Sequence, residues 1–205
     1  MTTAPHFPPS GPGARLLIVG PQGSGKGTQA KRISAAHGIP HVSTGDMFRE
    51  AIAVQTDLGR RVEPILAGGR LVPDDLTIAL IRDRLGRGDA LRGFVLDGFP
   101  RTLTQAEALD AMLEEEGRQL DAVFELQVSD GVARERLLNR AALENRPDDT
   151  PEAIGRRLAL YEEKTLPISE HYRARGILVG IHGERTPDEV FREIQQALRT
   201  LEARA

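Results

Sequence analysis

Five short runs of mostly apolar residues alternate along the chain with longer amphipathic stretches. The runs are Arg15–Gly20, Ile39–Ser43, Phe94–Gly98, Ala122–Val128 and Gly176–Ile181. Their hydrophobicity is continuous rather than alternating, which favours strands that are buried on both faces, as in parallel sheets. Strands that alternate with helices predict a doubly wound α/β fold with right-handed crossovers.

Helices are expected between and after these runs, at 26–36, 45–53, 57–67, 74–86, 104–116, 130–140, 151–163, 167–175 and 187–202. The last of them places four apolar side chains on one face, which predicts packing against the core; they are Val190, Ile194, Leu198 and Leu201. The helix at 74–86 follows Pro73, and we expect Asp74 to cap its N-terminus. Residues 44–72 and 136–157 interrupt the simple alternation and are expected to lie over a ligand site rather than in the core.

Composition narrows the class of protein. With 205 residues the chain is long enough for one sizeable core. A net charge of -3 gives no electrostatic case for binding nucleic acid or an anionic membrane, and no apolar run approaches membrane-spanning length. The absence of cysteine excludes disulfides and thiolate metal sites and fits a cytoplasmic location. Residues 1–13 lack the basic and apolar parts of a signal peptide and are expected to be a flexible leader.

A glycine-rich segment follows the first apolar run and reads GPQGSGKGT over residues 20–28. Successive backbone N–H groups ahead of a helix N-terminus form a concave anion site, and glycine lets phosphate approach the backbone closely. Lys26 adds a point charge for the outer phosphates. The usual pattern has Ser or Thr directly after the lysine, whereas here Gly27 intervenes before Thr28. The segment therefore predicts a phosphate-binding loop of an uncommon subtype.

A second motif, DGFPRT over residues 97–102, follows the third apolar run. An aspartate at the carboxyl end of a strand beside a phosphate loop can hold Mg²⁺ through water, which makes Asp97 the candidate metal residue. Arg101 projects from a turn shaped by Gly98 and Pro100, and its planar guanidinium suits a bidentate contact with phosphate. The alternative is a structural turn that carries a surface arginine.

Arginines gather in the segment 136–157, at Arg136, Arg140, Arg146, Arg156 and Arg157. A solvated helix face explains Arg156, but Arg140 and Arg146 flank a short connection and are expected to close over the phosphate loop. Phosphoryl transfer depends on positioning and charge neutralisation, and one well-placed arginine can contribute about 10³–10⁵ in rate. The histidines show no Ser-His-Asp or metal-ligand spacing, and an anionic acceptor needs no general base. These features favour a kinase that excludes water from its site.

The chain resembles the adenylate kinases over nearly everything after Gly13. The resemblance is carried by GSGKGTQ (23–29), STGDMFR (43–49), LVPD (71–74), DGFPRT with Gln105, and RPDD (146–149). It implies the reaction ATP + AMP ⇌ 2 ADP with Mg²⁺. It also implies a three-layer α/β/α P-loop NTPase fold around a five-stranded parallel sheet. An adenylate kinase domain would span 14–205, with an AMP-binding helical insertion at 43–72, a short lid at 139–149 and the remainder as core.

The resemblance also assigns roles by position. The ATP site would comprise Gly23, Ser24, Gly25, Lys26, Gly27, Thr28, Arg136, Arg140 and, through its backbone, Arg185. The AMP site would comprise Thr44, Arg49, Arg70, Leu71, Val72, Gly98, Phe99, Pro100, Arg101, Gln105, Arg146 and Arg157. Arg49 and Arg101 would grip the α-phosphate, and Gln105 would bond the adenine edge. Transfer itself would depend on Lys26, Arg101, Arg140, Arg146 and Arg157, the last two stabilising the moving phosphoryl group.

Two departures from the family pattern stand out, Pro21-Gln22 at the start of the loop and Asn145 before Arg146. Only five residues separate Arg140 from Arg146, too few for a long hairpin lid, and the lack of cysteine excludes a thiolate zinc site.

A UMP or CMP kinase with the same mechanism remains an alternative, although Thr44 and Gln105 favour adenine. A slow regulatory ATPase is a further alternative. The expected partners are ATP, AMP and ADP, with no nucleic acid or membrane, and the expected state is a monomer.

Overall fold

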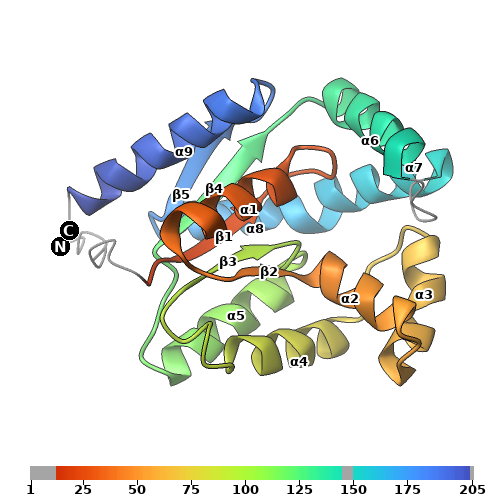
Figure 1. The fold of residues 1–205 in the computed structure, drawn as a ribbon, viewed down its shortest axis with the longest axis horizontal. Helices are drawn as coiled ribbons and strands as arrows, with labels where there is room; N and C mark the ends of the chain where they lie inside the picture. The colour runs from red at the N-terminus through yellow and green to blue at the C-terminus, as the bar shows by residue number, and fades with distance from the viewer. Residues whose placement is uncertain (1–12, 145–149, 204–205) are drawn as a thin grey trace.

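A computed structural model describes residues 13–144 and 150–203 of the chain. Its five strands are β1 (Arg15–Val19), β2 (His41–Ser43), β3 (Phe94–Asp97), β4 (Ala122–Gln127) and β5 (Leu178–His182). All pair in parallel, in the order β2-β3-β1-β4-β5 (Figure 1). The predicted parallel sheet is thereby confirmed. The fifth strand begins two residues later than the expected Gly176. Residues 1–12 of the expected leader lie outside the described part of the chain.

Helices cover both faces of the sheet and give the three-layer P-loop NTPase architecture that the sequence predicts. One face carries α1 (Lys26–His37) and α9 (Pro187–Glu202), and the other carries α4 (Asp74–Leu85), α5 (Leu103–Glu115) and α8 (Leu166–Ala174) (Figure 1). Successive side chains of β1 point to opposite faces, so that Leu17 joins one core cluster while Ile18 joins the other. Val190, Ile194 and Leu198 of α9 are buried on the same side of the sheet as α1, and Leu201 is half-buried there, as expected from their spacing.

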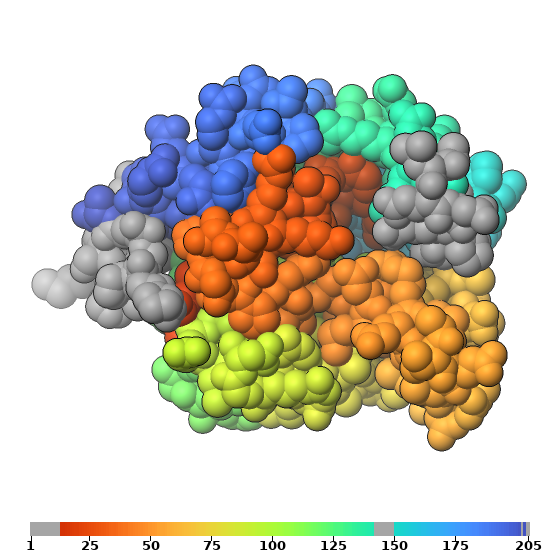
Figure 2. Space-filling view, viewed as in Figure 1, coloured from red at the N-terminus to blue at the C-terminus, as the bar shows by residue number. Residues whose placement is uncertain are grey.

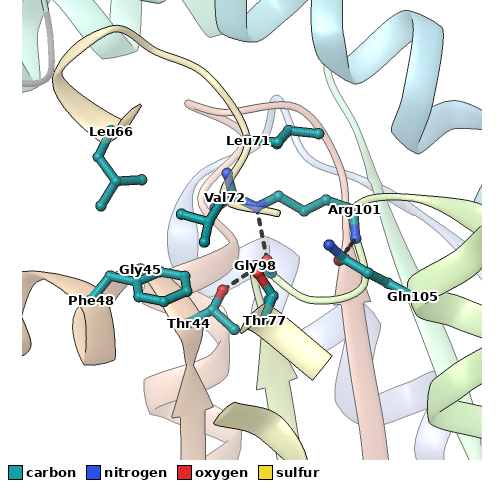
Figure 3. A pocket seen from close by; sticks show the side chains of 10 residues that line it. All are labelled: Thr44, Gly45, Phe48, Leu66, Leu71, Val72, Thr77, Gly98, Arg101 and Gln105. Carbon is teal, nitrogen blue, oxygen red and sulfur yellow. Dashed lines mark hydrogen bonds between the residues drawn. The ribbon is translucent and has the colours of Figure 1, made fainter. Parts of the chain in front are cut away.

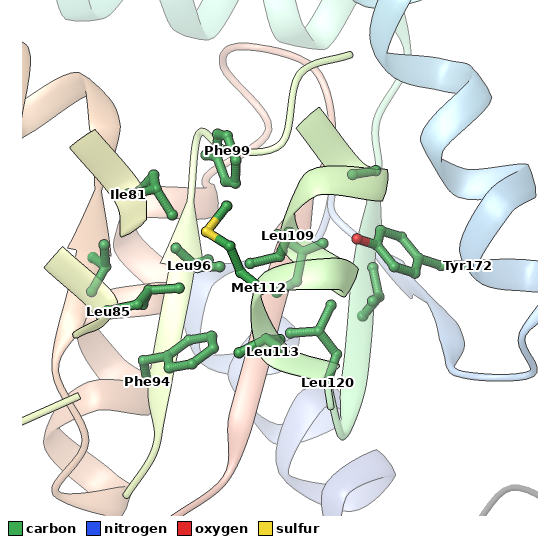
Figure 4. Close-up of a cluster of buried hydrophobic side chains, with 14 of the residues drawn as sticks. Ile81, Leu85, Phe94, Leu96, Phe99, Leu109, Met112, Leu113, Leu120 and Tyr172 are labelled. Atoms are coloured by element: carbon green, nitrogen blue, oxygen red, sulfur yellow. The ribbon is translucent and has the colours of Figure 1, made fainter. Parts of the chain in front are cut away.

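The core under α4, α5 and α8 holds the largest buried side chains, among them Phe94, Leu96, Leu109, Leu113 and Tyr172 (Figure 4). Strand and helix residues interdigitate there, and this packing fixes where α5 begins. Since α5 follows directly on the turn after β3, the core positions that turn at the carboxyl edge of the sheet.

Two helical pairs lie outside these layers. The pair α2 (Thr44–Ala53) and α3 (Asp57–Ala67) packs around Phe48, Val62 and Val72 in a small cluster of its own. The pair α6 (Asp130–Glu144) and α7 (Pro151–Leu160) packs around Leu137 and Ile154. A π-helical turn, Tyr161–Thr165 (η1), joins α7 to α8. None of the helices described combines the length and apolar character needed to cross a membrane.

Three details of the sequence prediction are wrong. The helix expected at 130–140 continues to Glu144, so that Arg140 lies within α6 rather than beside a loop. The helix expected at 151–163 is α-helical only to Leu160. Asp74 does not cap α4, because Pro73 occupies the N-cap position with an extended backbone and its carbonyl accepts from Thr77 N at 3.1 Å. Asp74 lies in the first turn of the helix, where its carboxylate is available to other partners.

Buried and exposed leucines of α5 offer a test of this core. Leu109 is fully buried, whereas Leu103, on the same helix, is 41% exposed. Leu109→Ala should lower the free energy of unfolding by about 2–5 kcal/mol because it leaves a cavity. Leu103→Ala should change it by less than about 0.5 kcal/mol. Urea unfolding of both variants measures the difference, and equal effects would contradict the assigned core.

Candidate active site

The loop between β1 and α1 wraps around a lysine. Gly23 and Gly25 have φ of +84° and +92°, which side-chain-bearing residues rarely adopt, and a Cβ at Gly23 would lie 2.3 Å from the Ala133 carbonyl oxygen in α6. Lys26 Nζ donates to the carbonyl oxygens of Gly20 and Pro21 at 2.7 Å each. The unusual Pro21-Gln22 start is thus compatible with a closed loop. In the space-filling view the red atoms of this region are recessed between α1–α2 and α6–α7 (Figure 2).

Three charged groups act on the Lys26 ammonium at this loop. Burial lowers the pKa of Lys26 from its ordinary 10.5 to about 8; the Asp97 carboxylate opposes this shift, and the charges of Arg101 and Arg140 add to it. Lys26, Asp97, Arg101 and Arg140 come from four different elements or turns, yet they are close enough to interact electrostatically. Three cations around a single carboxylate form a site that suits a polyanion.

Arg136 holds the turn after β5. Its guanidinium donates to the carbonyl oxygens of Gly183 at 2.8 Å and Glu184 at 3.2 Å, and the Glu184 carboxylate in turn accepts from Ser129 N at 2.8 Å. Arg185 follows in the same turn, but its side chain pairs with Glu193 of α9 at 3.3 Å. The Arg185 guanidinium is therefore directed toward α9, and the expected ATP contact through its backbone stays a prediction.

A hollow opens beside the phosphate loop (Figure 3). It is lined by Thr44, Gly45, Phe48, Leu66, Leu71, Val72, Thr77, Gly98, Arg101 and Gln105. Six of these residues were predicted from the sequence, namely Thr44, Leu71, Val72, Gly98, Arg101 and Gln105. The apolar wall of Phe48 and Leu66 was missed. Phe48 lies within a recognised motif, but nothing in the sequence distinguishes a pocket-lining ring from a core ring. An apolar wall with a few polar groups is the usual make-up of a small-molecule binding site.

The polar groups of this hollow are bonded to one another. Gly98 O accepts from Thr44 Oγ1 at 2.8 Å and from Arg101 Nε at 2.7 Å (Figure 3). Gln105 is buried; its Oε1 accepts from Arg101 N at 2.7 Å and its Nε2 donates to Asp74 Oδ1 at 2.7 Å. Since a buried polar side chain without partners is costly, this network fixes the side chains before any ligand binds.

The remaining predicted residues lie around the hollow in different ways. Arg49 pairs with Asp46 one turn earlier on α2, and Arg70 is exposed on the loop after α3. The Phe99 ring is buried in the core (Figure 4), so that Phe99 and the cis-bonded Pro100 can contribute to a site only through their backbone. Arg157 is half-buried on α7. Arg146, Asn145 and part of the expected lid at 139–149 lie outside the described residues.

Helix α7 touches the loop that carries Arg70, Leu71 and Val72. Arg156 Nε donates to Gly68 O at 2.7 Å, although the sequence suggested only a solvated arginine. Gly69 has φ of +67°, and a Cβ there would lie 2.8 Å from the Ala153 carbonyl oxygen. The contact could not be read from the sequence, because its partners are more than 80 residues apart and Gly69 carries no side-chain signal.

Asp97 is the one predicted metal residue. Its carboxylate lies 3.5 Å from His41 Nε2, and Gly27 of the phosphate loop approaches so closely that a Cβ there would be 3.4 Å from Asp97 Oδ2. Within the described ranges no group of three or more His, Cys, Asp or Glu side chains converges as a metal cage. A single carboxylate beside a phosphate loop nevertheless fits Mg²⁺, which takes most of its ligands from water and phosphate.

Comparisons with known proteins agree with this geometry. The family described as "Adenylate kinase" matches residues 18–177. The chain belongs to the adenylate kinase family. Adenylate kinase of Parvibaculum lavamentivorans is 46% identical over 187 residues, which cover 90% of this chain and 91% of that protein. Adenylate kinase of a Cyanothece species is 47% identical, and the match covers 92% of this chain and 96% of that protein. Adenylate kinase of Rhizobium meliloti is 46% identical, and the match covers 90% of this chain and 99% of that protein. The family predicted from the sequence motifs is thus confirmed.

Replacing the loop lysine should stabilise the fold at neutral pH. Because the pKa of Lys26 is lower in the folded protein than in the unfolded chain, the charged lysine destabilises the fold. This destabilisation is complete below about pH 8 and disappears above the ordinary pKa of 10.5. Lys26→Met should therefore raise the free energy of unfolding by about 1–3 kcal/mol at pH 7. This gain should shrink between pH 8 and pH 10.5, as urea unfolding across that range would measure.

Lys31→Met provides the control, because Lys31 is an exposed lysine on the same helix. It should leave stability nearly unchanged at every pH. If Lys26→Met destabilised the protein at pH 7, the burial of the Lys26 charge would be wrongly assigned.

Gly69→Ala should damage both the fold and the neighbouring hollow. The positive φ and the 2.8 Å approach to Ala153 predict a loss of about 1–3 kcal/mol in the free energy of unfolding. Gly155→Ala is the matched control on α7, since a Cβ there meets nothing within 4 Å and alanine favours helix. Gly155→Ala should leave stability unchanged or raise it. Thermal unfolding compares the two variants, and an equal response would contradict the close contact.

Proposed function

We propose that this chain transfers the terminal phosphoryl group of MgATP to AMP and forms two molecules of ADP, reversibly. The observation that carries the proposal is the placement of a phosphate loop beside a hollow with an apolar wall and a few polar groups. Asp97, Arg101 and Arg140 all act on the charge of Lys26 in the loop, and Arg101 also lines the hollow. Two anionic nucleotides, one at each half, need this concentration of positive charge between them.

In the proposed mechanism the loop residues 23–28 hold the ATP phosphates through backbone N–H groups, while the turn held by Arg136 borders the ATP base. Arg101 and Arg49 grip the AMP phosphate. An oxygen of that phosphate attacks the γ-phosphorus of ATP, and the bond from that phosphorus to the bridging oxygen breaks, leaving ADP on each side. Lys26, Arg140, Arg146 and Arg157 neutralise the charge on the moving group.

Asp97 would hold Mg²⁺ through water, and the ion would supply charge neutralisation on the ATP phosphates. The AMP phosphate is already ionised at neutral pH, so no side chain has to remove a proton. Water competes with AMP as the acceptor. We propose that residues 43–72 bind AMP and that 139–149 act as a lid that excludes water, with residues 14–205 forming one domain.

ATP, AMP and ADP are the proposed partners, and the monomeric state and cytoplasmic location stay predictions from the sequence. A UMP or CMP kinase would use the same transfer chemistry. The hydroxyl of Thr44 and the amide of Gln105 at the hollow support adenine instead, since a site built to bond one base edge rejects a base with the wrong donors and acceptors.

An acceptor panel tests the proposal. A coupled assay should measure kcat/KM with ATP and each of AMP, CMP, UMP and GMP as acceptor. AMP should exceed the pyrimidine nucleotides by at least about 100-fold, because the wrong base leaves buried polar groups unpaired. A faster reaction with UMP or CMP would overturn the choice of acceptor. Rapid ATP hydrolysis with no acceptor would favour a regulatory ATPase.

A further inference from the structure

The amide of Gln105 can face the hollow in only one way. Oε1 accepts from Arg101 N, a backbone group that can only donate, and Nε2 donates to Asp74 Oδ1, a carboxylate oxygen that serves here as acceptor. Turning the amide over would set its NH₂ against the backbone N–H and its carbonyl against the carboxylate. Both contacts would become repulsive, and thus the two fixed partners determine which end of the amide is which.

Asp74 is itself held in place. Thr102 Oγ1 donates to Asp74 Oδ2 at 3.1 Å and accepts from Gln105 N at 3.2 Å as the N-cap of α5. The carboxylate thus joins the first turn of α4 to the first turn of α5, from a half-buried position behind the hollow. It does not line the hollow, and Figure 3 shows Gln105 with its bond to Arg101 there.

We propose that Asp74 is a specificity-determining positioning residue, which selects adenine over 6-oxopurines by fixing the orientation of the Gln105 amide. An amide oxygen has two acceptor positions and an amide nitrogen two donors, so each end of Gln105 keeps one for a ligand. Adenine offers a 6-amino donor beside the N1 acceptor, which matches Oε1 beside Nε2. Hypoxanthine offers a 6-oxo acceptor beside an N1–H donor, the reverse pattern, which only the turned amide would match.

Thr44 points to the same choice. Its hydroxyl donates to Gly98 O, which can only accept, so the hydroxyl oxygen presents lone pairs to the hollow. A base with an exocyclic amino group can donate to it, whereas a 6-oxo group cannot. The inference rests on the proposed AMP-binding role of this hollow, and it adds Asp74 as the residue behind the base preference.

The matched ligands for a test are AMP and IMP, which differ only at these two ring positions. The readout is the ratio of kcat/KM for AMP to that for IMP, measured with saturating ATP. Asp74→Ala removes both acceptor oxygens, so that turning the amide is opposed by Arg101 N alone. The ratio should fall about tenfold, since a hydrogen bond to a charged group typically contributes that much or more. KM for ATP should stay within about twofold of the wild-type value.

Asp75→Ala is the matched control, because Asp75 is exposed in the same helical turn and its removal weakens the helix N-terminus equally. It should keep the wild-type ratio. Asp74→Asn keeps the shape of the side chain but can present either an oxygen or an amino group, and its ratio should fall by about threefold. It carries the test if Asp74→Ala does not fold.

A wild-type AMP-to-IMP ratio in Asp74→Ala, or in Asp74→Asn if the alanine variant does not fold, would overturn the inference. Equal losses with both nucleotides would overturn it too, because they would mark Asp74 as a purely structural residue. Calorimetric binding of AMP and IMP without ATP separates this inference from the proposed function. A wild-type protein that binds AMP more tightly than IMP but forms no ADP would contradict the proposed reaction and leave the role of Asp74 testable by binding.

Discussion

Parallel pairing of the five strands is the constraint on which the site depends. Each strand of a parallel sheet ends at the same edge, and ligands collect there. The register aligns Ile18 of β1 with Asp97 of β3, and Ser43 of β2 with the same Asp97. The phosphate loop, the start of α2 and the turn after β3 therefore emerge side by side, although they lie up to 80 residues apart in the chain.

Close backbone contacts then connect the outlying helices to this edge. Gly23 lets the phosphate loop approach Ala133 of α6, and Gly69 lets the loop after α3 approach Ala153 of α7. Thr165, at the end of the π-helical turn, donates to Arg101 O at 3.0 Å. The helical pair α6–α7 and the turn that follows it thus contact both halves of the proposed site, and in the proposed function these contacts would position its arginines between the two nucleotides.

Much of this architecture could be predicted from the sequence, because strands buried on both faces leave a clear apolar signal and phosphate loops need glycine at fixed places. The prediction failed where a residue's partner is distant. Asp74 has the residue type and position of a helix cap, but Gln105 and Thr102 offer its carboxylate better partners that only the fold brings near. Arg156 is exposed, as its sequence context predicts, but its bond to Gly68 O depends on the same kind of long-range contact and could not be predicted.

The helix boundary after Arg140 shows a different limit. Residues 141–144 are three alanine or leucine residues and a glutamate, all good helix formers, so α6 extends to Glu144. A short connection is expected there from the spacing of the arginines, but that expectation leaves out the high helix propensity of these four residues. The arginine therefore projects from a regular helix, which restricts its position more than a loop would.

The central claim is that two nucleotides face each other across one edge of the sheet and that water is kept out between them. The direct measurement follows a label placed in the γ-phosphoryl group of ATP, in the presence and absence of AMP. With AMP, the label should appear in ADP rather than in inorganic phosphate, and without AMP almost no inorganic phosphate should be released. Release of labelled inorganic phosphate at the same rate with and without AMP would contradict the account.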